Sequence, residues 1–231
     1  MRIRESAIRK EDIAKMFNSI APGYDRANTV LSFGADRRWR KKVIKALRPG
    51  HPTKIADIAT GTGKLAAMLA AKLKAEVYGI DISESMLEVA KKKYKNIHFI
   101  CADGETIPFP DNSFDALTIA FGIRNFENPV AGLKEACRVM KPRGMIAVLE
   151  FSKPSDNLFG RVFRFYFRHM IPFIGKIITG NGKAYRYLNQ SALTFISGIE
   201  FIELLNETGF KESAQQRLTG GIATLYTAVK G

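Results

Sequence analysis

The stretch Ile55-Ala-Asp-Ile-Ala-Thr-Gly-Thr-Gly-Lys64 decides the fold of this chain. The apolar residues around Asp57 predict a short buried strand, with the carboxylate near its end. Gly61 and Gly63 then permit a tight turn, which lets the backbone approach a ligand closely. The apolar periodicity of residues 65–73 predicts a helix. A strand, a glycine turn and a helix form the first half of a nucleotide-binding βαβ unit, so we predict an α/β fold.

The glycine spacing alone leaves the cofactor open, because Gly61-x-Gly63-x-x-Ala66 also fits a dinucleotide-binding fingerprint. Three aspartates give further evidence about which cofactor binds. Asp57, Asp81 and Asp103 each end one of three successive predicted strands, at the carboxyl edge where such sheets bind ligands. Uncompensated carboxylates repel a pyrophosphate and attract a sulfonium and an ammonium group. The pattern therefore favours S-adenosylmethionine over a nicotinamide cofactor, with helix N-capping by one or two of these residues as the alternative.

The net charge of +14 on 231 residues is unevenly distributed. Residues 1–50 hold thirteen basic against five acidic side chains, whereas residues 51–150 hold thirteen against twelve. This distribution indicates an anionic membrane or polyanion near the flanking segments, with solubility alone as the alternative. Cys101 and Cys137 lack metal-site spacing and indicate a reducing compartment. Because we also find no signal-peptide pattern and no apolar run near the ~20 residues that span a bilayer, we expect a cytoplasmic protein.

We predict one domain over residues 1–231, built around a parallel sheet that ends in a hairpin. Five βα strands plus this hairpin match the Rossmann-like seven-stranded sheet of class I methyltransferases better than a six-stranded dehydrogenase sheet. Within the N-terminal segment we expect a helical leader over residues 1–23, broken at Pro22-Gly23, and a basic helix over residues 40–47. The domain is divided into an N-terminal helical lid (1–50), a cofactor-binding core (51–152), a helical insertion (153–197), and a final helix with a β-hairpin (198–231).

The insertion contains an aromatic, basic stretch over residues 158–169. Arg161, Arg164 and Arg168 recur at helical spacing, so they share one face of a predicted helix. Residues 170–178 add further apolar surface. A basic, aromatic helix of this kind is typical of membrane-surface binding or of a cap over an apolar substrate, and an ordinary packed helix is the alternative.

Two long ordered signatures carry a family resemblance. The first is Tyr24-Asp25-x-x-Asn28-x-x-x-Ser32-Phe-Gly34, continuing to Trp39, and the second is Arg138-Val-Met-Lys-Pro-x-Gly144-x-x-x-x-x-Glu150-Phe-Ser152. Phe121-Gly-Ile-Arg-Asn125 lies between them, and Tyr185-Arg-Tyr-Leu188 follows. Over nearly its whole length the chain resembles the ubiquinone/menaquinone biosynthesis C-methyltransferases. It departs from their usual pattern at Ala27, Asp36, Lys64 and Arg143; the family commonly has histidine at position 36, so no imidazole acts there in this chain.

The resemblance implies S-adenosylmethionine-dependent carbon methylation of a prenylated hydroquinone, and it favours demethylmenaquinol as the acceptor. A benzoquinol of ubiquinone biosynthesis, or another small molecule, is the alternative. A nucleic-acid methyltransferase usually carries an Asn/Asp-Pro-Pro-aromatic motif where this chain has residues 121–125, so we expect no nucleic-acid partner. We expect no metal, and we expect docking on the inner face of the cytoplasmic membrane. A homodimer stays open.

The resemblance and the strand pattern together assign candidate site residues. Arg124 is expected to stabilise a developing phenolate, with Asn125 as a neutral donor beside it and Tyr24 as a substrate contact or proton relay. A water-mediated base involving this arginine, as considered for the family, stays open. For the lid and substrate we expect Asp25, Asn28, Trp39 and Tyr187. For the cofactor we expect Asp57 at the ammonium, Gly61, Thr62 and Gly63 as backbone contacts, Asp81 with Ile82 at the ribose, Asp103 with Gly104 and Met86 at the adenine, and Ala120.

Overall fold

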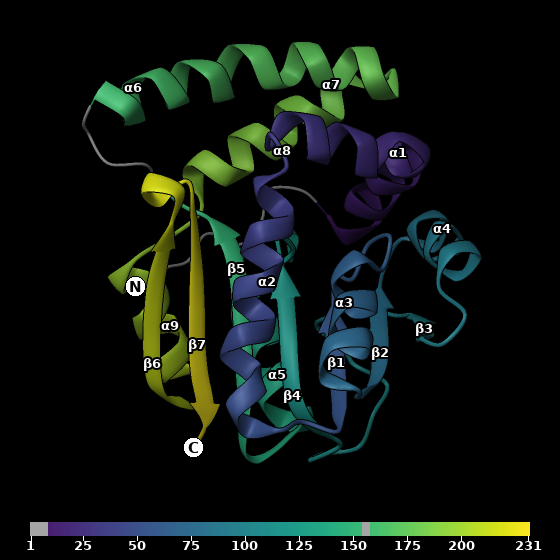
Figure 1. Cartoon of the computed structure of the whole chain (residues 1–231), viewed down its shortest axis with the longest axis vertical. Coiled ribbons are helices and arrows are strands. Elements are labelled where there is room, and N and C mark those ends of the chain that lie inside the picture. The colour runs from purple at the N-terminus through teal and green to yellow at the C-terminus, as the bar shows by residue number, and fades with distance from the viewer. Residues whose placement is uncertain (1–8, 154–157) are drawn as a thin grey trace.

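Seven strands form one mixed sheet in the order β3-β2-β1-β4-β5-β7-β6 in a computed structural model (Figure 1), which describes residues 9–153 and 158–231. The first five strands are parallel, and β7 runs antiparallel between β5 and β6. This arrangement confirms the predicted Rossmann-like seven-stranded fold with a terminal hairpin. The strands are β1 (Lys54–Ile58), β2 (Glu76–Asp81), β3 (His98–Cys101), β4 (Phe114–Ala120), β5 (Met140–Phe151), β6 (Phe210–Leu218) and β7 (Ala223–Lys230).

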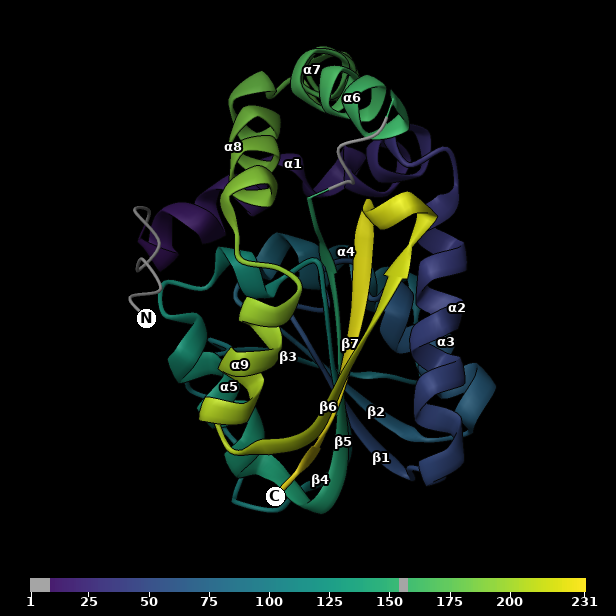
Figure 2. The same ribbon diagram turned by 90° about the vertical axis from the view of Figure 1, so that its left-hand side faces the viewer.

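Helices cover both faces of the sheet, as Figure 2 shows with the sheet seen along its edge. On one face lie α2 (Ala35–Leu47) and α3 (Lys64–Leu73), whose apolar side chains share a core with β1 and β5. The other face is covered by α5 (Pro129–Val139) and α9 (Ile199–Glu207). Because both faces are covered, the central strands β1 and β4 are buried along nearly their whole length rather than at alternate residues.

A layer of helices lies across the carboxyl edge of the parallel strands (Figure 1). It consists of α1 (Lys10–Leu31), α6 (Leu158–Phe165), the π-helical turn η3 (Tyr166–Met170), α7 (Ile171–Thr179) and α8 (Gly182–Thr194). The remaining elements are α4 (Glu84–Lys93) and the short turns η1 (Arg48–Gly50), η2 (Ile123–Asn125) and η4 (Thr219–Gly221). The predicted insertion thus joins the N-terminal helix in one layer.

The predicted break at Pro22-Gly23 is wrong, because α1 continues through Pro22 to Leu31. A proline inside a helix removes one hydrogen bond, and here burial of Ile20 and Ala27 on both sides of it opposes that loss. The part of the predicted leader over residues 1–8 lies outside the described residues.

One other predicted boundary differs in the structure. α2 begins at Ala35 rather than at residue 40, because Ala35, Asp36 and Trp39 are buried and belong to the same helix. β5 begins at Met140, and a bulge in its pairing with β4 separates Met140 from Met145. α4 is capped by Ser83, whose hydroxyl accepts a hydrogen bond from the Met86 amide.

Polar contacts attach the N-terminal helix to the sheet edge. Asn18 Oδ1 accepts hydrogen bonds from the Ser83 hydroxyl at 2.6 Å and from the Ser85 amide at 3.1 Å. Asp25 binds Lys93 Nζ at 2.5 Å and accepts a hydrogen bond from the Thr62 hydroxyl at 2.6 Å. These contacts hold α1 over the glycine turn, where it closes the site described next.

Candidate active site

Two cavities meet at the carboxyl edge of the sheet. The first, which we call the edge cavity, lies between α1 and the ends of β1, β2 and β4 and encloses about 690 Å³, including the part open to solvent. The second, the lid cavity, lies between α1, α2 and the helices of the insertion and encloses about 1220 Å³ by the same measure. Tyr24 and Phe121 line both cavities and therefore mark their junction.

The glycine turn leaves the floor of the edge cavity open. Gly61 has a φ of +56°, and a Cβ built there would have only a Tyr24 ring carbon, at 4.0 Å, within 4 Å. Asp81 stands beside it, and its carboxylate accepts hydrogen bonds from the amides of Gly61 at 2.7 Å and Ser83 at 2.8 Å. Burial raises the pKa of Asp81 to about 6, although these amides oppose the shift. The turn thus offers free space directly next to a half-buried carboxylate.

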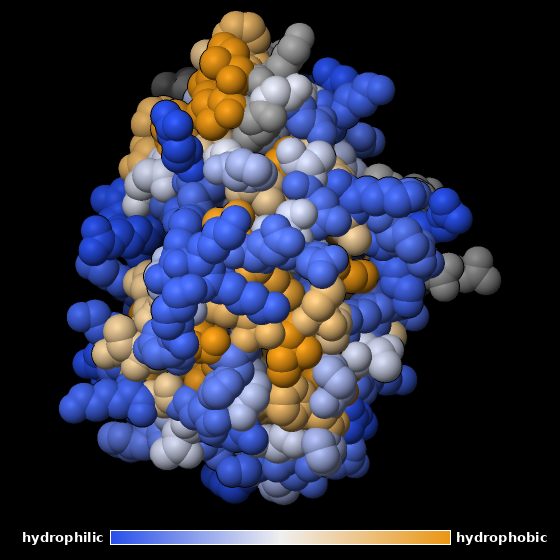
Figure 3. Space-filling view, turned by 90° about the vertical axis from the view of Figure 1, so that its right-hand side faces the viewer, coloured by the Kyte–Doolittle hydropathy of each residue, from blue (hydrophilic) through white to orange (hydrophobic). Residues whose placement is uncertain are grey.

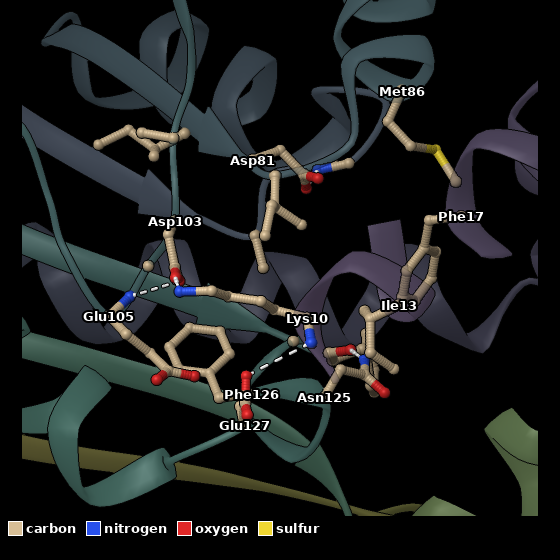
Figure 4. Close-up of a pocket in the computed structure, with 18 of the residues that line it drawn as sticks. Lys10, Ile13, Phe17, Asp81, Met86, Asp103, Glu105, Asn125, Phe126 and Glu127 are labelled. Atoms are coloured by element: carbon tan, nitrogen blue, oxygen red, sulfur yellow. Dashed lines mark hydrogen bonds and ion pairs between the residues drawn. The ribbon is translucent and has the colours of Figure 1, made fainter. Parts of the chain in front are cut away.

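Lys10 closes the far end of the edge cavity, as Figure 4 shows. Its Nζ lies 3.1 Å from Asp103 Oδ2, and its backbone amide donates to Glu127 at 3.4 Å. Apolar side chains of α1 and α4, among them Phe17 and Met86, form the opposite wall (Figure 4). The cavity therefore combines carboxylates on the strand ends with an apolar wall, which suits a cationic ligand that carries a flat ring.

The edge cavity contains most, but not all, of the predicted cofactor residues. Those that line it are Gly61, Asp81, Ile82, Met86, Asp103, Gly104 and Ala120. Asp57 is not among them: it is buried, and its two oxygens accept hydrogen bonds from Thr60 at 2.7 Å and Thr118 at 2.5 Å. Burial raises its pKa to about 6, opposed by both threonines. In this structure Asp57 braces the turn from below, and its contact with an ammonium group stays a prediction.

Thr62 and Gly63 also lie away from the lining of the edge cavity. The Thr62 hydroxyl donates to Asp25, and Gly63, with a φ of +77°, caps the start of α3. A Cβ at Gly63 would lie 2.8 Å from the Phe99 ring, which explains why glycine is needed here for packing. Of the three predicted turn residues, Gly61 lines the edge cavity, and the backbone contacts of Thr62 and Gly63 with a cofactor stay a prediction.

Arg124 lies at the lid-cavity side of the junction and is held by a buried ion pair. Its Nη1 lies 2.7 Å from Glu150 Oε1 and donates to the Phe121 carbonyl, also at 2.7 Å. Both side chains of the pair are nearly inaccessible, at 4% and 2% exposure. Burial raises the pKa of Glu150, and Arg124 opposes that shift. Asn125, the predicted neighbouring donor, lines the edge cavity instead.

Tyr24 lies between the edge cavity and the lid cavity. Burial raises the pKa of its phenol, and a hydrogen bond from Asn28 opposes the shift. Asn28 and Trp39, both predicted lid residues, line the lid cavity, and Trp39 Nε1 donates to the Thr219 hydroxyl at 2.8 Å. Asp25 acts from outside, through its contacts with Lys93 and Thr62.

Several lining residues were not predicted from sequence. Asp36 lies in the lid cavity, paired with Arg40 Nη1 at 2.6 Å. Tyr185 lines the lid cavity where Tyr187 was expected, because α8 turns residue 185 inward and leaves residue 187 at its flank. Lys10 lines the edge cavity from a position far from every motif. Asp36 and Arg40 are four residues apart, a spacing that also occurs in ion pairs on helix surfaces. The sequence therefore does not show that this pair lines a cavity.

No group of three His, Cys, Asp or Glu side chains placed to hold a metal occurs within residues 9–153 and 158–231. The polar side chains that line the two cavities carry amide, hydroxyl, carboxylate and guanidinium groups, together with the Lys10 ammonium and the Trp39 indole.

The sheet order, the glycine turn and the paired cavities at the strand ends define a class I S-adenosylmethionine-dependent methyltransferase. Solved structures share this fold. A SAM-dependent methyltransferase of Thermotoga maritima, titled a possible histamine N-methyltransferase, superposes with a TM-score of 0.69 at 21% identity over 94% of this chain and 99% of that one. Human N-acetylserotonin methyltransferase in complex with SAM gives a TM-score of 0.60 at 19% identity over 90% and 57% of the two chains.

The chain belongs to the ubiE/COQ5 methyltransferase family, whose sequence model matches residues 5–230. It is 44% identical to the ubiquinone/menaquinone biosynthesis C-methyltransferase UbiE of Geobacter sulfurreducens, over 96% of this chain and 89% of that protein. It is 41% identical to the demethylmenaquinone methyltransferase of Thermotoga maritima, over 88% and 90% of the two chains. The protein is accordingly an S-adenosylmethionine-dependent C-methyltransferase, which confirms the resemblance seen in its sequence.

Proposed function

We propose that this protein methylates a ring carbon of a prenylated hydroquinone, with demethylmenaquinol as acceptor and menaquinol as product. The observation that carries the proposal is the lid cavity: a large space walled by aromatic side chains that meets the edge cavity at Tyr24 and Phe121. The names of the two relatives, one for ubiquinone and menaquinone biosynthesis and one for demethylmenaquinone, support this acceptor class.

The edge cavity fits S-adenosylmethionine. The open space above Gly61 and the carboxylates of Asp81 and Asp103 suit ribose hydroxyls and a positively charged ligand, and the apolar wall at Met86 suits a purine ring. When bound, the cofactor supplies an electrophilic methyl group on a positively charged sulfur. Asp81 would accept from the ribose, Asp103 and Gly104 would lie at the adenine, and α1 would exclude water by covering the site.

The residues of the lid cavity orient the acceptor and stabilise its charge. Loss of a hydroquinone proton places negative charge on the oxygen and on the ring carbon beside it. The positive guanidinium of Arg124 stabilises that charge, and Glu150 keeps the guanidinium in place. Alignment of the ring carbon with the junction between the cavities removes orientational freedom before reaction, which can lower the barrier by several kcal/mol.

Aromatic side chains form the apolar part of the lid cavity. Phe121, Phe151, Phe163 and Phe167 lie in one continuous set of ring contacts, with centroids 4.6 Å apart for the first pair and 5.4 Å for the last. A fused naphthoquinol ring and the first units of a prenyl tail present flat and branched apolar surfaces that such walls can bury. This aromatic wall therefore suits an apolar acceptor better than a phosphate-bearing nucleotide.

The test is a methyl-transfer assay with labelled S-adenosylmethionine and chemically reduced acceptors of both ring types. Incorporation into a demethylnaphthoquinol is expected, with less into a benzoquinol and none into DNA or RNA. Absence of label in both quinol types, from enzyme that binds S-adenosylmethionine, would overturn the proposal. Preference for the benzoquinol would assign the protein to ubiquinone chemistry instead.

We further propose that the insertion docks the enzyme on an anionic membrane surface. Phe165, Met170, Phe173 and Ile177 form an apolar ridge along α6 and α7, with exposures of 64%, 42%, 62% and 68%. Figure 3 shows apolar side chains gathered at this end of the molecule, above a largely hydrophilic body. Phe33, 79% exposed, lies beside the ridge, its ring 5.6 Å from that of Tyr166.

Charge and position favour a lipid surface as the occupant of the ridge. Arg161 and Arg168 are exposed on the same helices, and the whole chain carries +14, so anionic headgroups complement it. The side chain of Arg164, predicted on this face, lies outside the described residues. Directly beneath the ridge, Tyr166 and Ile171 line the lid cavity, so a prenyl tail extending from the cavity would meet the bilayer. No helix in the described ranges combines the length and the apolar character that a membrane crossing requires.

Vesicle sedimentation tests the docking surface. Phe173→Ser/Ile177→Ser is expected to reduce binding to phosphatidylglycerol-containing vesicles by about tenfold or more, because two aromatic or aliphatic anchors are lost. Ile199→Ser is the matched control, since Ile199 is 63% exposed on α9, apart from the ridge. Equal binding to neutral and anionic vesicles, or equal loss in the control, would contradict the proposal. Association with the inner face of the cytoplasmic membrane and a homodimer stay predictions, which fractionation and light scattering test.

A further inference from the structure

Two buried polar side chains of α8 face the lid cavity. Tyr185 and Asn189 are 2% and 5% exposed, and both line the cavity. They are four residues apart on the helix, so their side chains lie on one face. Tyr24, which lies at the junction, lines the same cavity as Tyr185 and Asn189.

One atom of each side chain lacks a partner. The Tyr185 phenolic oxygen and Asn189 Oδ1 are buried and make no hydrogen bond with the described protein. Asn189 Nδ2 donates to the Phe167 carbonyl, which fixes the amide: the nitrogen faces the carbonyl and Oδ1 is the atom left free. Buried polar atoms are satisfied in nearly all native structures, so two unpaired atoms on one cavity wall indicate that a ligand completes them.

We propose that Tyr185 and Asn189 bind a ring hydroxyl of the acceptor and select its reduced form. This inference rests on the proposed function. A hydroquinone hydroxyl can donate to Asn189 Oδ1 and accept from the Tyr185 phenol at the same time. A quinone carbonyl has no hydrogen to donate, so Oδ1 would face another acceptor oxygen and stay unpaired. Tyr185 alone cannot discriminate, because its hydroxyl pairs with either form.

The charged groups of the lid cavity do not perform this selection. Arg124 and Arg40 are donors only, so a carbonyl and a hydroxyl both satisfy them. The oxygens of Asp36 already accept hydrogen bonds from Ser32 at 3.2 Å and Arg40 at 2.6 Å. Among the unpartnered side-chain atoms of the described residues that line this cavity, Asn189 Oδ1 is the one that can accept but not donate. Selection matters chemically, because only the electron-rich reduced ring attacks an electrophilic methyl group.

The test compares the affinities for both redox forms under anaerobic conditions. The chain has a single tryptophan, Trp39, which lines the lid cavity, so quenching of its fluorescence reports acceptor binding. The probe is a short-chain demethylnaphthoquinone, used oxidised and after reduction. The wild-type protein is expected to bind the reduced form about ten- to a hundredfold tighter, and Asn189→Leu is expected to remove that ratio.

Tyr185→Phe should weaken binding of both forms to a similar degree, and Gln190→Leu, on the exposed side of α8, should change neither. Thermal unfolding and S-adenosylmethionine affinity check that each variant is folded; Asn189→Met, of similar volume, serves if leucine disturbs α8. A preserved ratio in a folded Asn189 variant, or no ratio in the wild type, overturns the inference alone. No binding of either form by folded wild-type enzyme overturns the proposed function itself.

Discussion

Removal of Glu150 leaves the guanidinium of Arg124 buried without its counter-charge. The pair is 2.7 Å long and its side chains are 4% and 2% exposed, so solvent cannot replace the lost partner. Breaking a buried pair in this way costs roughly 3–5 kcal/mol of unfolding free energy. At about 2–4 °C per kcal/mol for a chain of this size, Glu150→Leu is expected to lower Tm by about 6–20 °C.

The double variant Arg124→Leu/Glu150→Leu separates stability from chemistry. Removing both charges and filling the space with apolar atoms is nearly neutral, about 1 kcal/mol or less of net loss, because no unpaired charge remains. We therefore expect the double variant to unfold close to the wild type while its methyl transfer is lost, since the group that stabilises the phenolate is gone. Glu150→Gln is the intermediate control, because its amide oxygen still accepts from Arg124.

Urea unfolding measured on the wild type, both single variants and the double variant gives the coupling energy of the pair. Turnover of labelled cofactor is measured on the same samples. A double variant that is as unstable as the sum of the two single variants would show that the two charges are not coupled. A double variant with wild-type turnover would remove Arg124 from the chemistry and refute its assigned role.

Three further outcomes follow from the electrostatics and the glycine turn. Because burial raises the pKa of Asp81 to about 6, S-adenosylmethionine affinity measured by calorimetry should fall about tenfold per pH unit below about pH 6, and Asp81→Asn should flatten that dependence. Burial alone would raise the pKa of Asp115, but hydrogen bonds from Lys141, Thr53 and the Lys54 amide lower it. Asp115 therefore stabilises the fold fully above the usual aspartate pKa of about 4 and loses this contribution at lower pH. Asp115→Asn should accordingly weaken the acid dependence of urea unfolding. Gly61→Val should reduce cofactor affinity at least about tenfold by filling the edge cavity at a positive φ, whereas Gly50→Ala, which has open space and an ordinary φ, should not.

The core of the fold could be predicted from local patterns in the sequence. The first three strands follow from short apolar runs and the first turn from its glycines, whereas the terminal hairpin follows from the Gly220-Gly221 turn; the structure has each of them. Asp81 and Asp103 line the edge cavity because parallel strands necessarily bring their carboxyl ends to one edge. Local chemistry and the geometry of a parallel sheet were sufficient for these residues.

Residues outside the parallel sheet could not be placed in the same way. Asp57 shares the strand-end position of the other carboxylates, but threonine hydroxyls satisfy it within the protein, and sequence spacing does not show such pairing. Tyr185 and Tyr187 are the same residue type in one short motif, so the sequence does not show which of them faces the cavity. The packing of α8 decides that it is Tyr185. Pro22 predicted a break that tertiary burial overrode.

The junction between the cavities couples the two binding sites through one strained residue. Phe121 has a φ of +58°, which is unfavourable for an aromatic residue and costs of order 1–3 kcal/mol unless its surroundings hold it. Its amide donates to the Leu149 carbonyl at 2.7 Å, and its own carbonyl accepts from Arg124. The guanidinium that stabilises the acceptor therefore also fixes the wall beside the cofactor. A substitution at Arg124 therefore removes the charge that stabilises the acceptor and the contact that holds Phe121, whereas Glu150→Gln keeps both the guanidinium and that contact.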